Sequence, residues 1–162
     1  MRDIILVQAS EITRVLIITL TAVGIFISLY FTLAFYTRVK ESRWIPQILC
    51  APQGSSCATV VQTPYARIFS VPNSLVGIVF YLAILIWLPW TSDVHFQEEH
   101  LWLVLGWTGA LILGSAASVI LGFYLMNALR HILRTDCPLC YTAHAINALL
   151  LLLLILRTLW ML

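Results

Sequence analysis

The chain has 162 residues, of which 61% are hydrophobic and only 10% are charged. A soluble domain carries about 25% charged residues, so this composition excludes an ordinary soluble protein and indicates a chain that lies in lipid. The net charge of +2 offers no basic stripe interleaved with aromatic residues, which excludes nucleic-acid binding.

Four apolar segments follow one another along the chain, and each approaches the roughly 20 residues that a membrane-spanning helix needs. The first exceeds the apolar core of about 7–15 residues found in signal peptides, so we expect a retained helix. Asn73 precedes the second segment as its predicted N-cap. We predict an all-α membrane protein, a bundle of four transmembrane helices forming a single domain over 1–162, with helices at about 15–37, 74–90, 101–126 and 138–160.

The third segment carries small residues at a strict spacing of four. Such a ladder lets membrane helices approach closely, which predicts a structural role in packing the bundle. Its members are Gly106, Ala110, Gly114, Ser118 and Gly122.

The cysteines form two pairs. Cys50 and Cys57 lie in the connection at 38–73, and Cys137 and Cys140 lie at the start of the last helix, after the connection at 127–137. Counting membrane crossings places both connections on the same side of the membrane. All four thiols therefore face one compartment. The first pair has six intervening residues of loop character, which predicts a dithiol that can open and close.

Cys137 and Cys140 form a CxxC motif at a helix start, where unpaired N–H groups and the helix dipole favour the reactive thiolate. Pro138 suits the first turn, and Thr135 or Asp136 is the expected cap.

His144 and Asn147 continue the helical face that begins with the CxxC, because the spacings are three, four and three. Polar side chains in an apolar membrane-spanning segment usually face a bundle interior or a cavity. A hydrogen bond to a neighbouring helix is the alternative for His144, but its alignment under the CxxC favours a site.

Two dithiols on one side suggest thiol–disulfide exchange through a mixed disulfide. A zinc site and inert structural disulfides compete with this interpretation. The six-residue spacing of the first pair disfavours zinc, and a helix bundle in lipid has little need of structural disulfides. Neither alternative accounts for His144, so we expect no metal.

The chain resembles the vitamin K epoxide reductase family over most of its length. The resemblance rests on Cys137-Pro-Leu-Cys140 with Ala145-Ile146-Asn147, and on Val71-Pro-Asn-Ser-Leu-Val-Gly77 leading to Tyr81. It implies a quinone-dependent thiol–disulfide oxidoreductase of four helices. A thioredoxin-like partner reduces the loop disulfide through Cys50, Cys57 passes electrons to Cys137, and Cys140 faces a quinone such as ubiquinone, menaquinone or vitamin K.

The same resemblance implies that Asn73 and His144 hydrogen-bond the quinone oxygens, with Asn147 as a further contact. Animal members usually carry tyrosine where this chain has His144, and Thr63 stands where a loop serine is common. Histidine titrates near neutrality, so His144 is also a candidate proton donor. Many prokaryotic relatives carry a fused thioredoxin-like domain; here the expectation is a stand-alone, prokaryotic-type protein with a separate thiol partner.

Three functions remain open at this stage: disulfide generation, reduction of vitamin K epoxide or quinone for its own sake, and a non-enzymatic metal-binding or structural membrane protein. The family usually works on the extracytoplasmic side of the membrane, where disulfides persist, so we expect a plasma membrane protein with its cysteines outside. The positive-inside rule favours the opposite orientation, because Arg2, Arg14 and Arg157 on the side of the termini are outnumbered by Arg38, Lys40, Arg43, Arg67, Arg130 and Arg134.

Overall fold

The computed structural model describes residues 2–37, 60–68, 70–91, 100–135 and 137–161. Four long helices make up most of this part of the chain, and each contains a stretch long and apolar enough to cross a membrane. The prediction of an all-α, four-helix membrane bundle is confirmed, and the protein is a multi-pass membrane protein. The helices are α1 (Arg2–Thr37), α3 (Asn73–Trp90), α5 (Leu101–Ala128) and α6 (Pro138–Met161).

Two helices extend beyond the apolar runs that predicted them. Helix α1 begins at Arg2, well before the predicted residue 15, because apolarity marks only the part in lipid while the backbone remains helical through polar residues. Glu11 and Arg14 form an ion pair (3.6 Å) one turn apart there. Helix α5 continues into a five-residue π-helix, Leu129–Leu133, which ends at Arg134 in the left-handed conformation (φ 48°).

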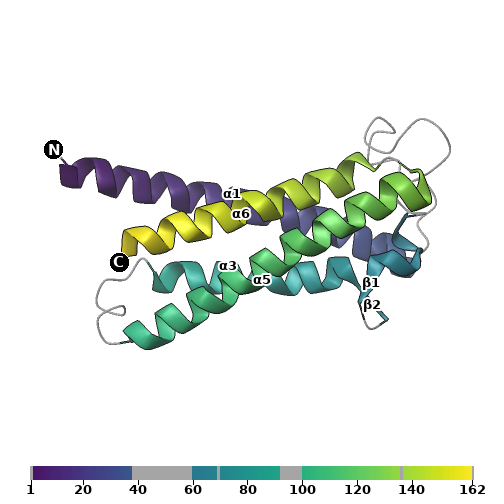
Figure 1. The fold of residues 1–162 in the computed structure, drawn as a ribbon. Coiled ribbons are helices and arrows are strands. Elements are labelled where there is room, and N and C mark those ends of the chain that lie inside the picture. Colours follow the sequence, from purple (N-terminus) through teal and green to yellow (C-terminus); the bar gives the residue numbers. More distant parts are fainter. Residues whose placement is uncertain (1, 38–59, 69, 92–99, 136, 162) are drawn as a thin grey trace.

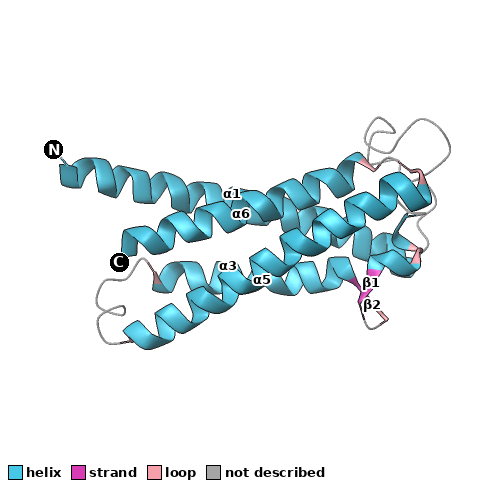
Figure 2. Ribbon diagram, viewed as in Figure 1, coloured by secondary structure: helices cyan, strands magenta, loops and turns pink. Residues whose placement is uncertain are grey.

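The segment before α3 is short and irregular. A 3-10 turn, Pro64–Ala66, leads into strands β1 (Arg67–Ile68) and β2 (Val71–Pro72), which pair antiparallel. Figure 2 shows this hairpin at the end of the bundle where α6 begins, opposite both termini. The predicted crossing count therefore holds for the described residues, and the CxxC lies at the hairpin end.

Helix α1 packs against α3 and α6, and α5 packs mainly on α6, whereas α3 and α5 contact each other less extensively. The fully buried core is aliphatic and aromatic, with Ile17, Ile84, Trp87, Leu150 and Leu154 at its centre. Large apolar side chains such as Phe26, Trp102 and Leu113 point outward, as expected for surfaces that contact lipid chains.

Polar side chains join the helices pairwise inside the bundle. Thr32 Oγ1 of α1 donates to Ser74 Oγ of α3 (2.9 Å), and Trp87 Nε1 of α3 donates to Thr108 Oγ1 of α5 (2.9 Å). Such bonds hold membrane helices together because lipid offers no competing partner.

Arg157, at the opposite end of the bundle, is a charged residue that is only 5% exposed. Its guanidinium donates to Thr91 Oγ1 (3.1 Å) and to the carbonyl oxygens of Thr91 (3.3 Å) and Ser10 (3.4 Å). Three segments far apart in the sequence therefore meet at this side chain.

The small-residue ladder of α5 packs closely against neighbouring helices at two of its glycines, as predicted, but not at the third. A Cβ added at Gly114 would lie 3.1 Å from the Phe80 ring and one at Gly122 would lie 2.7 Å from His144 Nδ1, whereas one at Gly106 would meet no described atom within 4 Å. The close approach of α5 is therefore found toward the hairpin end of the bundle and not at Gly106 (Figure 1).

Candidate functional site

The CxxC motif begins helix α6 as predicted, with Pro138 as its first residue. Cys137 and Cys140 form a disulfide with their Cα atoms 5.2 Å apart. The backbone N–H of Cys140 donates to the Cys137 carbonyl oxygen (3.0 Å) and also contacts Cys137 Sγ (3.3 Å), so the sulfur shares an N–H group that already has a backbone partner. The hydroxyl of Thr135, one of the two predicted caps, donates to the Leu133 carbonyl (3.0 Å). The other, Asp136, lies outside the described residues, so the predicted cap stays a prediction.

The two cysteines have different surroundings. Cys137 is fully buried in the apolar core, whereas Cys140 is half-buried and lines a cavity. Of this pair, Cys140 is therefore the sulfur in contact with the cavity.

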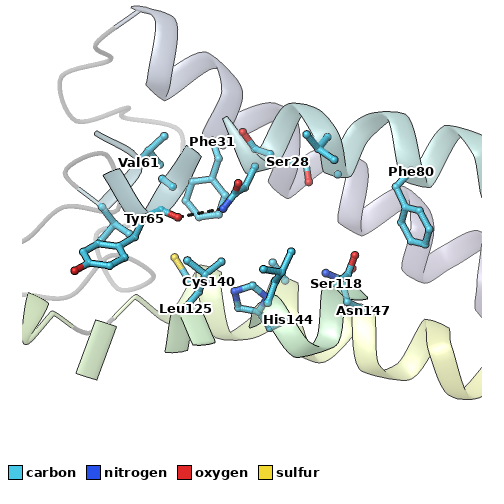
Figure 3. A pocket seen from close by; sticks show the side chains of 18 of the residues that line it. Ser28, Phe31, Val61, Tyr65, Phe80, Ser118, Leu125, Cys140, His144 and Asn147 are labelled. Carbon is cyan, nitrogen blue, oxygen red and sulfur yellow. Dashed lines mark hydrogen bonds between the residues drawn. The ribbon is translucent and has the colours of Figure 1, made fainter. Parts of the chain in front are cut away.

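This cavity has a volume of about 370 Å³ and is lined by residues of all four long helices and of the segment 60–66. Its walls are mostly apolar and include Phe31, Val61, Phe80, Leu121 and Leu125. Figure 3 shows Tyr65 and Cys140 toward one end, His144 beyond Cys140, and Asn147 and Phe80 farther along. An apolar pocket with a few polar groups is the usual form of a small-molecule site.

Asn73 supplies one of those polar groups from the first turn of α3. It is not the N-cap, which corrects the prediction: Pro72 takes that position, and Asn73 is the first helical residue. Its side chain is instead engaged by the neighbouring 3-10 turn, where Asn73 Nδ2 donates to the Tyr65 carbonyl (3.2 Å; dashed in Figure 3). Asn73 Oδ1 is buried and has no partner among the described residues.

His144 supplies a second polar group, one helical turn after Cys140. Its Nδ1 is buried and also has no partner within the described part of the chain. The imidazole packs directly against the backbone of α5 at Gly122, where a side chain would collide with the ring. A buried polar atom without a partner costs about 1–3 kcal/mol, and both of these atoms, unpaired among the described residues, belong to side chains that line the cavity.

Asn147 lies deeper and is already paired. Its Oδ1 accepts a hydrogen bond from Tyr81 Oη (2.7 Å), which joins α3 to α6. The Tyr81 ring fits because Gly24 of α1 has no side chain: an added Cβ would lie 2.5 Å from the ring. This group borders the far part of the cavity.

The structure brings together four of the predicted site residues, because Cys140, His144, Asn147 and Asn73 all line one cavity, with Cys137 bonded to the first. Cys50 and Cys57 lie outside the described residues. Sequence reasoning missed the site contributions of Tyr65 and Tyr81. A signal for Tyr81 existed, since Asn73, Gly77 and Tyr81 recur every four residues on one face of α3 and all line the cavity.

Two arginines make contacts with aromatic rings at the hairpin end of the bundle. The guanidinium of Arg67 lies over the Phe35 ring (4.9 Å to the centroid), and that of Arg130 lies 5.7 Å from the Tyr141 centroid. Both rings accept a cation–π contact, which helps fix the hairpin and the α5–α6 junction.

Comparisons with known proteins agree with this geometry. A family model described as the vitamin K epoxide reductase family matches residues 15–155, a range that contains all four cysteines, Asn73, His144 and Asn147. A search of curated proteins finds no match.

Proposed function

Because the chain belongs to the vitamin K epoxide reductase family, whose members are membrane oxidoreductases that act on disulfides and quinones, we propose that it transfers electrons from protein thiols to a membrane quinone. The physiological result is disulfide formation in a thioredoxin-like partner protein.

The observation that carries the proposal is the position of Cys140 on the wall of a cavity that Asn73 and His144 also line. Each of these two residues has one buried polar atom, Asn73 Oδ1 and His144 Nδ1, without a partner among the described residues. A redox-active sulfur, an apolar pocket and hydrogen-bonding groups are the three requirements for reducing a lipid-soluble ring compound.

A quinone head group fits the chemistry of these residues. Its flat ring suits apolar walls, and its oxygens need polar partners near the sulfur. When bound, the quinone accepts two electrons and two protons. We assign Asn73 and His144 to its oxygens, and Asn147 to a supporting position because its carbonyl oxygen already accepts from Tyr81.

The proposed electron path runs from the partner to Cys50, then from Cys57 to Cys137, with Cys140 next to the quinone. In the last step the Cys137–Cys140 dithiol loses two electrons and two protons, one S–S bond forms, and two O–H bonds form on the quinone. The structure contains the product of that step on the protein side, the Cys137–Cys140 disulfide.

The decisive experiment counts free thiols. Ubiquinone added to fully reduced, purified protein should lower the number of free thiols from four to zero. Cys140→Ser should abolish this loss, and Cys50→Ser should block oxidation of a thioredoxin-like partner while Cys137 and Cys140 still react with quinone. Four thiols that persist in the presence of quinone would refute the proposal.

His144 is proposed to deliver a proton to the reduced quinone. The test is His144→Phe, which keeps a flat ring and removes the titratable nitrogen. We expect slower quinone reduction and a changed pH profile; full turnover at every pH contradicts this role.

A second candidate function uses the same site: reduction of vitamin K epoxide or quinone as the main purpose, with thiols as the electron source. Assays of purified protein with the epoxide and with the quinone separate the two functions. A metal-binding or structural role predicts instead that chelators unfold the protein and that quinone leaves the thiols reduced.

For orientation we propose a prokaryotic plasma membrane with the cysteines on the extracytoplasmic side. An impermeant maleimide applied to intact cells after reduction should then label Cys50 or Cys57. Labelling only after lysis would establish the inverted orientation, which the distribution of arginines and lysines favours.

A further inference from the structure

We propose that three exposed arginines at the hairpin end of the bundle, Arg67, Arg130 and Arg134, bind the headgroup phosphates of anionic phospholipids. These side chains lie outside the cavity, and the inference does not depend on the proposed reaction.

Charge is distributed unevenly between the two sides of the membrane. The crossing count places six of the nine lysines and arginines on the cysteine side, together with two acidic residues, Glu41 and Asp136. The other side carries three arginines and five acidic residues. The cysteine side is therefore the basic side, and its field attracts anions.

The three arginines have no acidic partner within the described part of the chain. All three residues are exposed, and no carboxylate among the described residues pairs with their guanidinium groups. At the other end, by contrast, Arg14 pairs with Glu11, and Arg157 is hydrogen-bonded inside the bundle. An exposed guanidinium without a carboxylate partner offers its N–H groups to a phosphate, often two at once.

Two of these guanidinium groups are held by aromatic rings. That of Arg67 lies 4.9 Å from the centroid of the Phe35 ring, and that of Arg130 lies 5.7 Å from the centroid of the Tyr141 ring. A ring covers one face of the planar group and leaves its N–H edge available for a phosphate. The ring also restricts a long side chain in advance, which lowers the entropy cost of binding.

The level of these side chains in the membrane follows from α5. Its candidate span of 33 residues is about 50 Å long, so its ends extend beyond a hydrocarbon layer of about 30 Å. The exposed Trp102 and Tyr124 are 22 residues apart, about 33 Å along the helix, and such aromatic residues collect at the two membrane interfaces. Arg130 follows Tyr124 by six residues, about 9 Å, so its side chain reaches the headgroup layer.

At this level the anions that surround a membrane protein are lipid phosphates. Anionic phospholipid is favoured over zwitterionic lipid because the latter carries a cation beside its phosphate. Each arginine near a membrane surface favours the anionic lipid by about fivefold. Lipid binding thus gives the basic excess a role whichever compartment the cysteines face.

The test titrates purified full-length protein in detergent with dioleoylphosphatidylglycerol or dioleoylphosphatidylcholine and counts bound lipids by native mass spectrometry. We expect phosphatidylglycerol to bind at least about fivefold more tightly, the effect of one arginine. Arg130→Gln should lower this ratio, and replacing all three arginines by glutamine should bring it close to one. Arg14→Gln is the matched control from the other end and should leave the ratio unchanged.

Two further measurements use the unmodified protein. Raising the ionic strength tenfold should reduce the preference for phosphatidylglycerol, because exposed charges are screened. Glycerol 1-phosphate at the same concentration should not displace the lipid; displacement would show that a free phosphate ester is the ligand, which contradicts a lipid site.

Equal affinity for the two lipids overturns the inference. So does a preference that survives the triple substitution or the higher ionic strength, or one that Arg14→Gln reduces equally. If the triple variant keeps its lipid preference and only oxidises a thioredoxin-like protein more slowly, the arginines bind an acidic protein surface and the inference is wrong.

Discussion

Gly122→Ala tests the position of His144 with a single methyl group. The new Cβ would lie 2.7 Å from His144 Nδ1 and 3.0 Å from Cγ, well inside the contact distance of about 3.5 Å. Cγ is bonded to Cβ and does not move when the ring rotates about the Cβ–Cγ bond. Ring rotation therefore cannot relieve the overlap, and the helices must move apart. Overpacking of this kind costs about 1–3 kcal/mol.

Gly106→Ala is the matched control, since it lies on the same helix with no atom within 4 Å of the added Cβ. Both substitutions gain the same helix propensity, so their difference isolates the collision. For a chain of this size we expect Gly122→Ala to melt about 2–10 °C below Gly106→Ala in the same detergent, and to reduce quinone slowly.

The double variant Gly122→Ala with His144→Ala removes the obstructing ring. It should recover the melting temperature, apart from the effect of His144→Ala alone, but not the quinone reduction. Equal melting temperatures for Gly122→Ala and Gly106→Ala, or no coupling between positions 122 and 144, would mean that the imidazole does not lie against α5. The placement of His144 beside the cavity would then be wrong.

Four further substitutions test buried contacts. Gly24→Ala should lower the melting temperature because its Cβ would lie 2.5 Å from the Tyr81 ring. Tyr81→Phe should leave Asn147 Oδ1 without its hydroxyl partner, a loss of about 1–3 kcal/mol that is measurable as a lower melting temperature. Trp87→Phe should cost about 1–2 kcal/mol by leaving Thr108 without its indole partner, and adding Thr108→Val should return part of that loss in a melting experiment. Arg157→Leu should leave the Thr91 and Ser10 carbonyls without their guanidinium partner; we expect a lower melting temperature with quinone binding retained, because the cavity lies at the other end of the bundle. Equal melting points for any of these variants and the parent protein would contradict the corresponding contact.

Much of the fold was predictable because the bilayer imposes a simple rule on the sequence. Apolar runs gave four helices in the correct order, and the crossing count placed the hairpin end and the CxxC together. The ends of the helices were less predictable. Helix α1 begins at Arg2, but the residues from Arg2 to Arg14 include charged and polar side chains and so do not continue the apolar run from which the helix was predicted.

Site residues that share one helix could be predicted from their spacing, whereas contacts between residues of different elements could not. Cys140, His144 and Asn147 share a face of α6, which spacing alone reveals. The direction of the Asn73 amide depends on a carbonyl eight residues away, and the space for His144 depends on Gly122 of another helix. No local pattern contains that information.

The buried Arg157 also has a consequence for how the protein is made. A charged residue in a membrane helix costs about 2.5–3.5 kcal/mol to insert at the helix centre, and less toward its ends. The partners of Arg157, Ser10 and Thr91, are synthesised earlier in the chain. The hydrogen-bond partners of the Arg157 guanidinium are therefore already part of the chain when the last helix is made, and the cost of burying this charge is offset only where α6 meets Ser10 and Thr91.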